Sequence, residues 1–185
     1  MANQEHLTSL KQGADFWNLW RSERGISEPD LSNADFRGAY LPKVDLSNAD
    51  CSGANFSSAY LEDANFIRAD LSGAIFRQAN CSNACFSEAN FIGCDFYRAV
   101  LTRVNFSSAD LRYAKFRESV LGGTSFANLD LSLAESLASC THEGTSLITN
   151  ETLQKSQRLS ELFLKGVGLT DWEIEHNKLY QPDLC

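Results

Sequence analysis

The chain has 185 residues, a net charge of −8 and an isoelectric point of about 4.8. This acidic balance argues against direct binding to nucleic acid. The sequence holds no secretory hydrophobic region and no apolar run of about eighteen residues, so we expect no membrane association and a cytoplasmic location.

Residues 1–28 are predicted to form an N-terminal capping helix. Between residues 4 and 24, apolar side chains recur at helical spacing, and Gly25 is expected to end the helix. The apolar positions are Leu7, Leu10, Ala14, Trp17 and Trp20, with Phe16 and Leu19 widening the stripe. An aromatic-rich helix could instead bind a membrane, but the charged residues here are mixed in sign rather than basic. The stripe therefore favours a cap.

A strict period of five residues begins at Leu31 and ends at Leu131. Every fifth position between them is Leu, Phe or Cys, twenty-one times in succession, and the residue two places earlier is almost always Ala. A helix has a period of 3.6 and a strand a period of 2, so neither produces this spacing. Residues 29–131 are therefore predicted to be a repeat array.

Segments such as Ala69–Gly73 and Ala109–Tyr113 match the consensus A(D/N)LXX, and the array resembles the pentapeptide-repeat family. The resemblance implies an all-β solenoid, a right-handed quadrilateral β-helix in which five residues form one face and four faces form one coil. It also implies that the central Leu or Phe and the preceding Ala point inward, while the other three positions point outward.

The central residues also sort by type when they are read with a period of twenty. Two opposite columns carry mostly Phe, and the two columns between them carry mostly Leu or Cys. The Phe-rich columns are Phe36, Phe56, Phe76, Phe96 and Phe116, and Leu46, Phe66, Phe86, Phe106 and Phe126. Like residues stacked at roughly 4.8 Å explain this pattern if twenty residues make one turn. About five coils then form a rod of roughly 25 Å, whose two open ends need a cover.

After Leu131 the period fails, because position 136 is Ser. Residues 132–185 are predicted to form a loop followed by helices, which cap the rod or bind a partner. An apolar stripe is expected on these helices at Leu159, Leu162, Phe163 and Val167. Thr170–Glu173 has the pattern of a capping box that opens a last helix. The region 142–169 is also similar to a segment that follows pentapeptide repeats in bacterial proteins with further effector domains.

The sequence contains no recognisable catalytic constellation, and we expect neither an enzyme nor a bound cofactor or metal ion. The three His residues are scattered without metal-ligand spacing, and no phosphate-binding Gly loop or nucleophile motif occurs. Cys51, Cys81 and Cys94 are expected to point inward as small apolar side chains. Cys140 and Cys185 lie in the C-terminal segment, where a disulfide is an open alternative.

Function is expected to lie on the outward columns, which differ from face to face. The acidic column consists of Asp30, Asp50, Asp70, Asp110 and Asp130. The basic column consists of Arg37, Arg77 and Arg117. The Tyr/Val strip consists of Tyr40, Tyr60, Val100 and Val120. Asp side chains also form turns, and single exposed apolar residues are common, so each column has a purely structural explanation too. A contiguous apolar surface is typical of an interface, so the Tyr/Val strip is predicted to contact a partner or the C-terminal helices.

These features predict a non-catalytic protein-interaction scaffold, a monomer or weak homodimer whose partner is a protein. One alternative is a DNA-mimic regulator of a type II topoisomerase, because some members of the resembled family are similar to duplex DNA in width and charge. Residues 30–131 weaken it, since they hold twelve acidic against nine basic side chains, a net of −3. The other alternative is an adaptor or sensor module derived from a longer effector protein.

Overall fold

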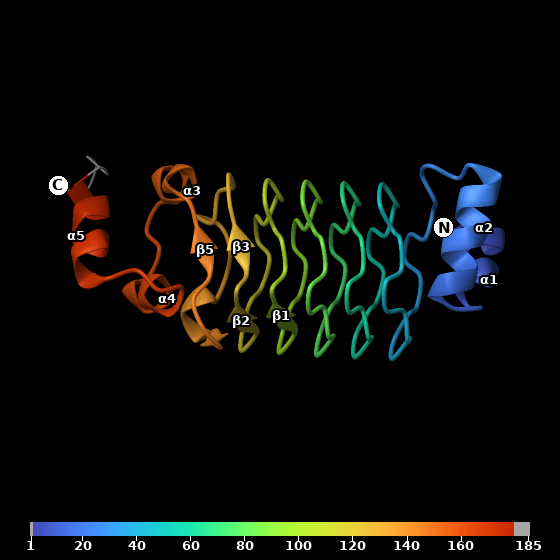
Figure 1. The fold of residues 1–185 in the computed structure, drawn as a ribbon, viewed down its shortest axis with the longest axis horizontal. Helices are drawn as coiled ribbons and strands as arrows, with labels where there is room; N and C mark the ends of the chain where they lie inside the picture. Colours follow the sequence, from blue (N-terminus) through green and yellow to red (C-terminus); the bar gives the residue numbers. More distant parts are fainter. Residues whose placement is uncertain (1, 180–185) are drawn as a thin grey trace.

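The computed structural model describes residues 2–179, which form a rod of stacked coils with helices at both ends (Figure 1). Helices α1 (Gln4–Leu10) and α2 (Ala14–Arg24) lie at the N-terminal end of the rod. The other end carries η1 (Leu137–Ser139), α3 (Asn150–Lys155), α4 (Glu161–Gly166) and α5 (Asp171–Leu179). The last six residues of the predicted C-terminal segment lie outside the described residues, and with them Cys185 and the alternative of a disulfide to it.

Parallel pairing at a spacing of twenty residues joins each coil to the next. Tyr40 pairs with Tyr60, for example, through a single β-bridge. The amide of Leu31 donates to the carbonyl of Asp50 at 2.7 Å, and equivalent bonds recur along the rod. Most of these contacts are single bridges because the chain turns a corner after each one. The longer strands are β1 (Val100–Thr102), β2 (Val120–Gly122), β3 (Ser125–Phe126), β4 (Thr141–His142) and β5 (Leu147–Ile148). The pairing confirms a solenoid with twenty residues in each turn.

The corners between faces use left-handed backbone, which recurs every five residues. Asn33 has a φ of 57° and Asn48 a φ of 55°, and Gly occupies several equivalent positions. Gly53 has a φ of 64°, and a Cβ there would meet the side-chain oxygen of Asn33 at 2.6 Å. Glycine and asparagine tolerate this conformation better than other residues. Glycine and asparagine therefore favour the turn at the corners that they occupy, while residues such as Lys43 and Arg68 adopt the same conformation at other corners.

The interior of the rod is a ladder of aromatic rings. The buried ring of Phe56 lies 5.0 Å from Phe36 and 4.9 Å from Phe76, and both contacts are stacked. Phe66, in the opposite column, meets Phe56 and Phe76 edge-on at 5.7 and 6.0 Å. The inward Ala residues, such as the fully buried Ala54, leave the space that these rings fill. The predicted inward columns are confirmed.

The predicted single helix over residues 4–24 is wrong, because the structure holds two helices there. The amides of Gln12 and Gly13 donate to the carbonyls of Ser9 and Leu10 at 3.2 and 3.0 Å, which is a tighter turn than an α-helix makes. Gly13 then adopts a φ of 103°, which favours glycine. This break lets both Leu10 and Trp17 bury their side chains at the end of the rod.

Side chains of α2 bond to the backbone edge of the first coil. The indole nitrogen of Trp17 donates to the carbonyl of Asp45 at 2.8 Å. Arg21 is only 7% exposed, and its guanidinium donates to four carbonyls at 2.6–3.0 Å. These are the carbonyls of Ile26, Ser27, Asp45 and Ser47. The carbonyls of Asp45 and Ser47 belong to the first coil, so they have no preceding coil to pair with and α2 supplies their donors.

Parallel pairing continues past residue 131, where the five-residue period ends. Lys115 pairs with Glu135 at the usual spacing of twenty, but Val120 of β2 pairs with Thr141 of β4, twenty-one residues later. The pairing of β3 with β5 is offset by twenty-two residues. Leu137 is buried, one position after the place at which the period expects a buried residue. Inserted residues therefore shift the register while the backbone stays stacked.

The C-terminal helices bond to the last paired coil. The hydroxyl of Thr152 on α3 donates to the carbonyl of Phe126 at 2.7 Å, and the amide of Leu131 donates to the hydroxyl of Ser156 at 2.9 Å. Phe163 of α4 is fully buried, and its ring lies 5.9 Å from Phe126, at the end of the aromatic ladder. Helices α3 and α4 thus cover the second end of the core.

Two predictions for the C-terminal helices have different outcomes. Leu162 is exposed, so its place in the predicted apolar stripe is wrong; it precedes the buried Phe163 by one residue and so points to another side of α4. The predicted capping box is confirmed at the start of α5. The amide of Thr170 donates to the carboxylate of Glu173 at 2.8 Å, and the amide of Glu173 donates to the Thr170 hydroxyl at 3.3 Å.

His142 on β4 makes the C-terminal end sensitive to pH. Its Nδ1 is buried and has no hydrogen-bond partner among the described residues, and its ring lies 6.0 Å from the ring of Phe163. Burial lowers the pKa of His142 below the ordinary value of 6.5. As the pH falls below that value, the unfolded chain therefore binds a proton that the folded chain does not, and stability falls.

We expect the urea midpoint to drop between about pH 7.5 and pH 5.5, and His142→Leu to reduce that drop. Comparing the variant with the unchanged chain isolates the contribution of His142 from that of His6, whose Nδ1 accepts the amide of Asp30 at 3.0 Å. An equal loss of stability in both chains would contradict the assignment to His142.

Candidate protein-interaction surfaces

The Tyr/Val strip follows one face of the rod. Backbone bridges join Tyr40 to Tyr60 and continue through Asn80 to Val100 and Val120. Tyr40 is 73% exposed and Tyr60 is 53% exposed, and their ring centres lie 6.0 Å apart at an angle of 52°. Val100 and Val120 are half-buried. The structure therefore brings the four residues into one column, with its large exposed side chains at the N-terminal end.

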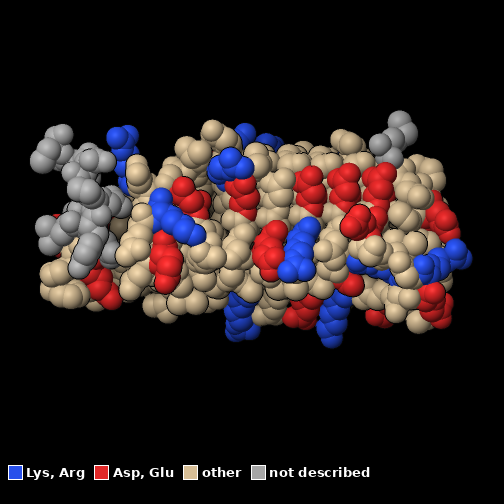
Figure 2. Space-filling model, turned by 90° about the horizontal axis from the view of Figure 1, so that it is seen from above, with Lys and Arg blue, Asp and Glu red and all other residues tan. Residues whose placement is uncertain are grey.

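The acidic column runs along another face. Backbone bridges join Asp30, Asp50 and Asp70 in order, and each carboxylate accepts the amide of the residue two places later at 2.9–3.0 Å. This is the turn-forming role of Asp. Further along the column, Asp110 pairs with Arg112 at 2.6 Å. Figure 2 shows one face of the rod on which acidic side chains form a row along the axis, with basic side chains beside them.

Each arginine of the basic column lies beside a carboxylate, so the column carries little net positive charge. Hydrogen bonds from Arg37 lower the pKa of Asp35 to about 2. The pairs are Arg37–Asp35 and Arg77–Asp95, both at 2.7 Å, and Arg117–Glu118 at 3.2 Å.

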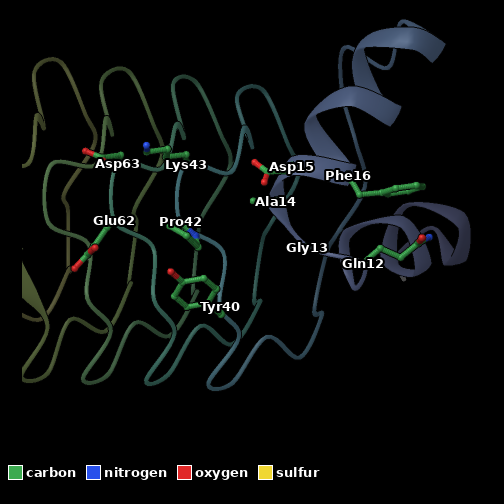
Figure 3. A pocket seen from close by; sticks show the side chains of 10 residues that line it. All are labelled: Gln12, Gly13, Ala14, Asp15, Phe16, Tyr40, Pro42, Lys43, Glu62 and Asp63. Carbon is green, nitrogen blue, oxygen red and sulfur yellow. The ribbon is translucent and has the colours of Figure 1, made fainter.

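A groove of about 640 Å³ lies where the start of α2 meets the face of the Tyr/Val strip (Figure 3). We call it the α2 groove. Residues 12–16 line one side, and the other side is formed by Tyr40, Pro42, Lys43, Glu62 and Asp63. The groove was not predicted from the sequence, because its lining combines residues of the first helices with residues of the first two coils.

The predicted widening of the buried stripe of α2 by Phe16 and Leu19 is wrong, since both side chains are exposed. Trp17 and Trp20 instead bury the side of α2 that faces the coil. Phe16 therefore adds an exposed ring to the lining of the α2 groove.

Within residues 2–179, no group of three or more His, Cys, Asp or Glu is placed to hold a metal ion. No helix in that same range is long and apolar enough to cross a membrane. Burial raises the pKa of the Cys51 and Cys81 thiols, and that of Cys140 to about 11, so these groups carry little thiolate at neutral pH.

Sequence comparison identifies the family of this solenoid. The family model described as pentapeptide repeats (8 copies) matches four overlapping segments, residues 30–66, 54–91, 84–123 and 105–135, which together are more than half of the chain. The chain belongs to the pentapeptide repeat family. Its twenty-residue pairing corresponds to one turn of the right-handed quadrilateral β-helix of that family. No curated protein sequence matches the chain.

The chain is similar to several solved structures, among them those of HetL, Rfr23 and QnrB1. HetL, a pentapeptide repeat protein involved in heterocyst differentiation regulation from the cyanobacterium Nostoc sp. strain PCC 7120, is 26% identical, with a TM-score of 0.44 over 71% of this chain and 58% of HetL. Rfr23 from the cyanobacterium Cyanothece 51142 is 19% identical, with a TM-score of 0.45 over 72% of this chain and 95% of Rfr23. QnrB1, a plasmid-mediated fluoroquinolone resistance protein, is 18% identical, with a TM-score of 0.35 over 84% of this chain and 94% of QnrB1. The chain thus spans less than two thirds of the length of HetL.

Proposed function

We propose that this chain is a non-catalytic scaffold that binds a protein partner through the Tyr/Val strip. The observation that carries the proposal is the exposure of Tyr40 and Tyr60, whose tilted rings lie side by side on the wall of a packed rod. Large exposed aromatic side chains on a preordered surface are typical of binding hot spots. The interior is filled with side chains, so the outer walls are what the rod offers to other molecules.

The helices at the two ends act as caps in this proposal. Trp17 and Arg21 bond to the open backbone edge of the first coil, and Thr152 and Ser156 bond to the last one. Open edges of stacked β-structure otherwise pair with further chains. Capping about five coils in this way favours a monomer, or a weak homodimer that associates through its sides. The cytoplasm is the location that we propose for it.

Affinity capture from the native host tests the proposed interface. Tyr40→Lys/Tyr60→Lys replaces the exposed rings by charges, and we expect recovery of the partner to fall about ten-fold or more. Tyr113→Lys is the matched control, because Tyr113 is 52% exposed and lies outside the strip. Equal recovery with the double variant and the unchanged chain would show that the strip is not the interface.

The DNA-mimic alternative rests on the acidic column of Asp30, Asp50, Asp70, Asp110 and Asp130. It is less well supported, because nine basic side chains lie among the twelve acidic ones of residues 30–131 and several form ion pairs with them. The adaptor alternative has one favourable observation at the C-terminal end of the rod, where Leu162 and Trp172 expose large apolar side chains.

A further inference from the structure

We propose that the α2 groove, together with Tyr60, binds an extended segment of a partner protein through an arginine side chain. The inference rests on the proposed function and adds the chemistry of the partner at the exposed end of the Tyr/Val strip. Figure 3 shows Tyr40 and Pro42 between the start of α2 and the carboxylates of Glu62 and Asp63. A groove of about 640 Å³ has room for a long side chain and part of its backbone.

The charges that line the groove favour a cation. Three carboxylates, those of Asp15, Glu62 and Asp63, accompany a single ammonium group, that of Lys43. Across the part of the chain that the structure describes, no Lys or Arg nitrogen lies within 4.0 Å of these carboxylates. The lining therefore has a net charge of two negative units that complements a basic segment.

Two of the three carboxylates are placed to meet the incoming cation. Asp15 lies in the first turn of α2, where the positive end of the helix dipole offsets its charge. Glu62 and Asp63 lie one coil further from α2 than Pro42 and Lys43 do. The carboxylate of Glu62 accepts a hydrogen bond from the side-chain amide of Asn80 at 2.6 Å. That bond holds Glu62 in position, so we assign Glu62 and Asp63 to the arginine of the partner.

Tyr97, a half-buried tyrosine on the outside of the rod, shows how a ring of this chain receives a guanidinium group. The guanidinium carbons of Arg98 and Arg117 lie 5.0 and 5.6 Å from the ring centre of Tyr97. No Lys or Arg among the described residues takes that place over Tyr40 or Tyr60. A planar guanidinium stacks on an aromatic face while its fork pairs with carboxylates, which the compact lysine ammonium does not do. These open rings beside carboxylates therefore fit arginine better than lysine.

Fluorescence anisotropy with three labelled octapeptides, of alternating Arg and Gly, Lys and Gly, and Glu and Gly, tests this inference. We expect the Arg peptide to bind more tightly than the Lys peptide and the Glu peptide not to bind. Two double variants should each weaken the binding of the Arg peptide about ten-fold or more: Glu62→Gln/Asp63→Asn and Tyr40→Ser/Tyr60→Ser. Asp63 has a φ of 59°, which Asn tolerates well, so these variants are expected to fold.

Two matched controls separate a specific site from general charge attraction. Asp50→Asn/Asp70→Asn removes the same number of charges from the acidic column, and Asn still accepts the turn hydrogen bonds. Tyr113→Ser removes a tyrosine as exposed as Tyr60. Both controls should change the affinity by less than about two-fold, because screening weakens distant charges.

Equal weakening by the two carboxylate pairs, or equal affinity for the Arg and Lys peptides, would overturn the arginine site. The capture experiment is independent of the peptides. If Tyr40→Lys/Tyr60→Lys still lost its partner in that case, the scaffold function would stand and only the arginine assignment would fall.

Discussion

Phe76→Ala is expected to lower the free energy of unfolding by about 3–5 kcal/mol, the range found when large aromatic side chains are removed from cores. The ring of Phe76 is fully buried and stacks on Phe56 at 4.9 Å and on Phe96 at 5.3 Å. It also meets Phe66 and Phe86 of the opposite column edge-on at 6.0 and 5.9 Å. Each coil supports only its two neighbours, so a cavity at mid-rod weakens both halves.

Urea unfolding followed by circular dichroism measures the effect of Phe76→Ala. Ile75→Ala is the matched control. Ile75 directly precedes Phe76 in the chain, but it points outward and is only half-buried. We expect the control to cost much less than the core variant. A loss for Phe76→Ala no larger than that for Ile75→Ala would contradict the inward aromatic ladder.

Arg21→Leu is expected to destabilise the protein by about 3–5 kcal/mol, as the removal of one member of a buried charged network does. The variant removes the guanidinium donor from four carbonyls: those of Ile26, Ser27 and Ser47 lose their side-chain donor, and that of Asp45 keeps only the Trp17 indole. Each unsatisfied buried carbonyl costs about 1–3 kcal/mol. The carboxylate of Asp45, 3.5 Å from the guanidinium, also loses this ion pair, although it still accepts hydrogen bonds from Ser47 and Asn65. Two of these carbonyls belong to the edge of the first coil, so we also expect α2 to loosen and the rods to associate end to end.

Size-exclusion chromatography and urea unfolding together test the cap. Arg24→Leu is the matched control, because Arg24 lies on the same helix and pairs with Glu5 at 3.0 Å, but both of these side chains are more than half exposed. An exposed ion pair contributes about 0–1 kcal/mol, so this control should stay monomeric and stable. A monomeric Arg21→Leu protein of unchanged stability would show that the buried guanidinium does not hold the cap.

Most of the fold was predictable from the sequence of the repeat, because each inward position is filled by one side chain at a fixed spacing. The interior columns and the turn of twenty residues follow from that rule alone. The rule fails where residues are inserted, so the continued pairing through β4 and β5 was not predictable from the period. Helices were predicted less well. A stripe of apolar residues does not show that Gly13 breaks the first helix, or that Leu162 leaves the buried side.

The surface columns were predictable as positions but not as electrostatic features. The partner of Arg77 is Asp95, eighteen residues later on the next coil, and a column of arginines read alone omits such partners. The α2 groove depends on how a helix lies against the coils, which no pattern within either segment specifies. Of the residues that line it, only Tyr40 was predicted from the sequence to lie at an interaction surface, as a member of the Tyr/Val strip.

The uniform turn of twenty residues gives the rod a property that most folds lack. Each coil bonds only to the coil before it and the coil after it, and a whole turn returns every face to the same side of the rod. Gain or loss of one complete turn would therefore change the distance between the two capped ends in a step of roughly 4.8 Å. The rod can thus serve as a molecular ruler, with a length that evolution adjusts in whole units while both ends keep their design.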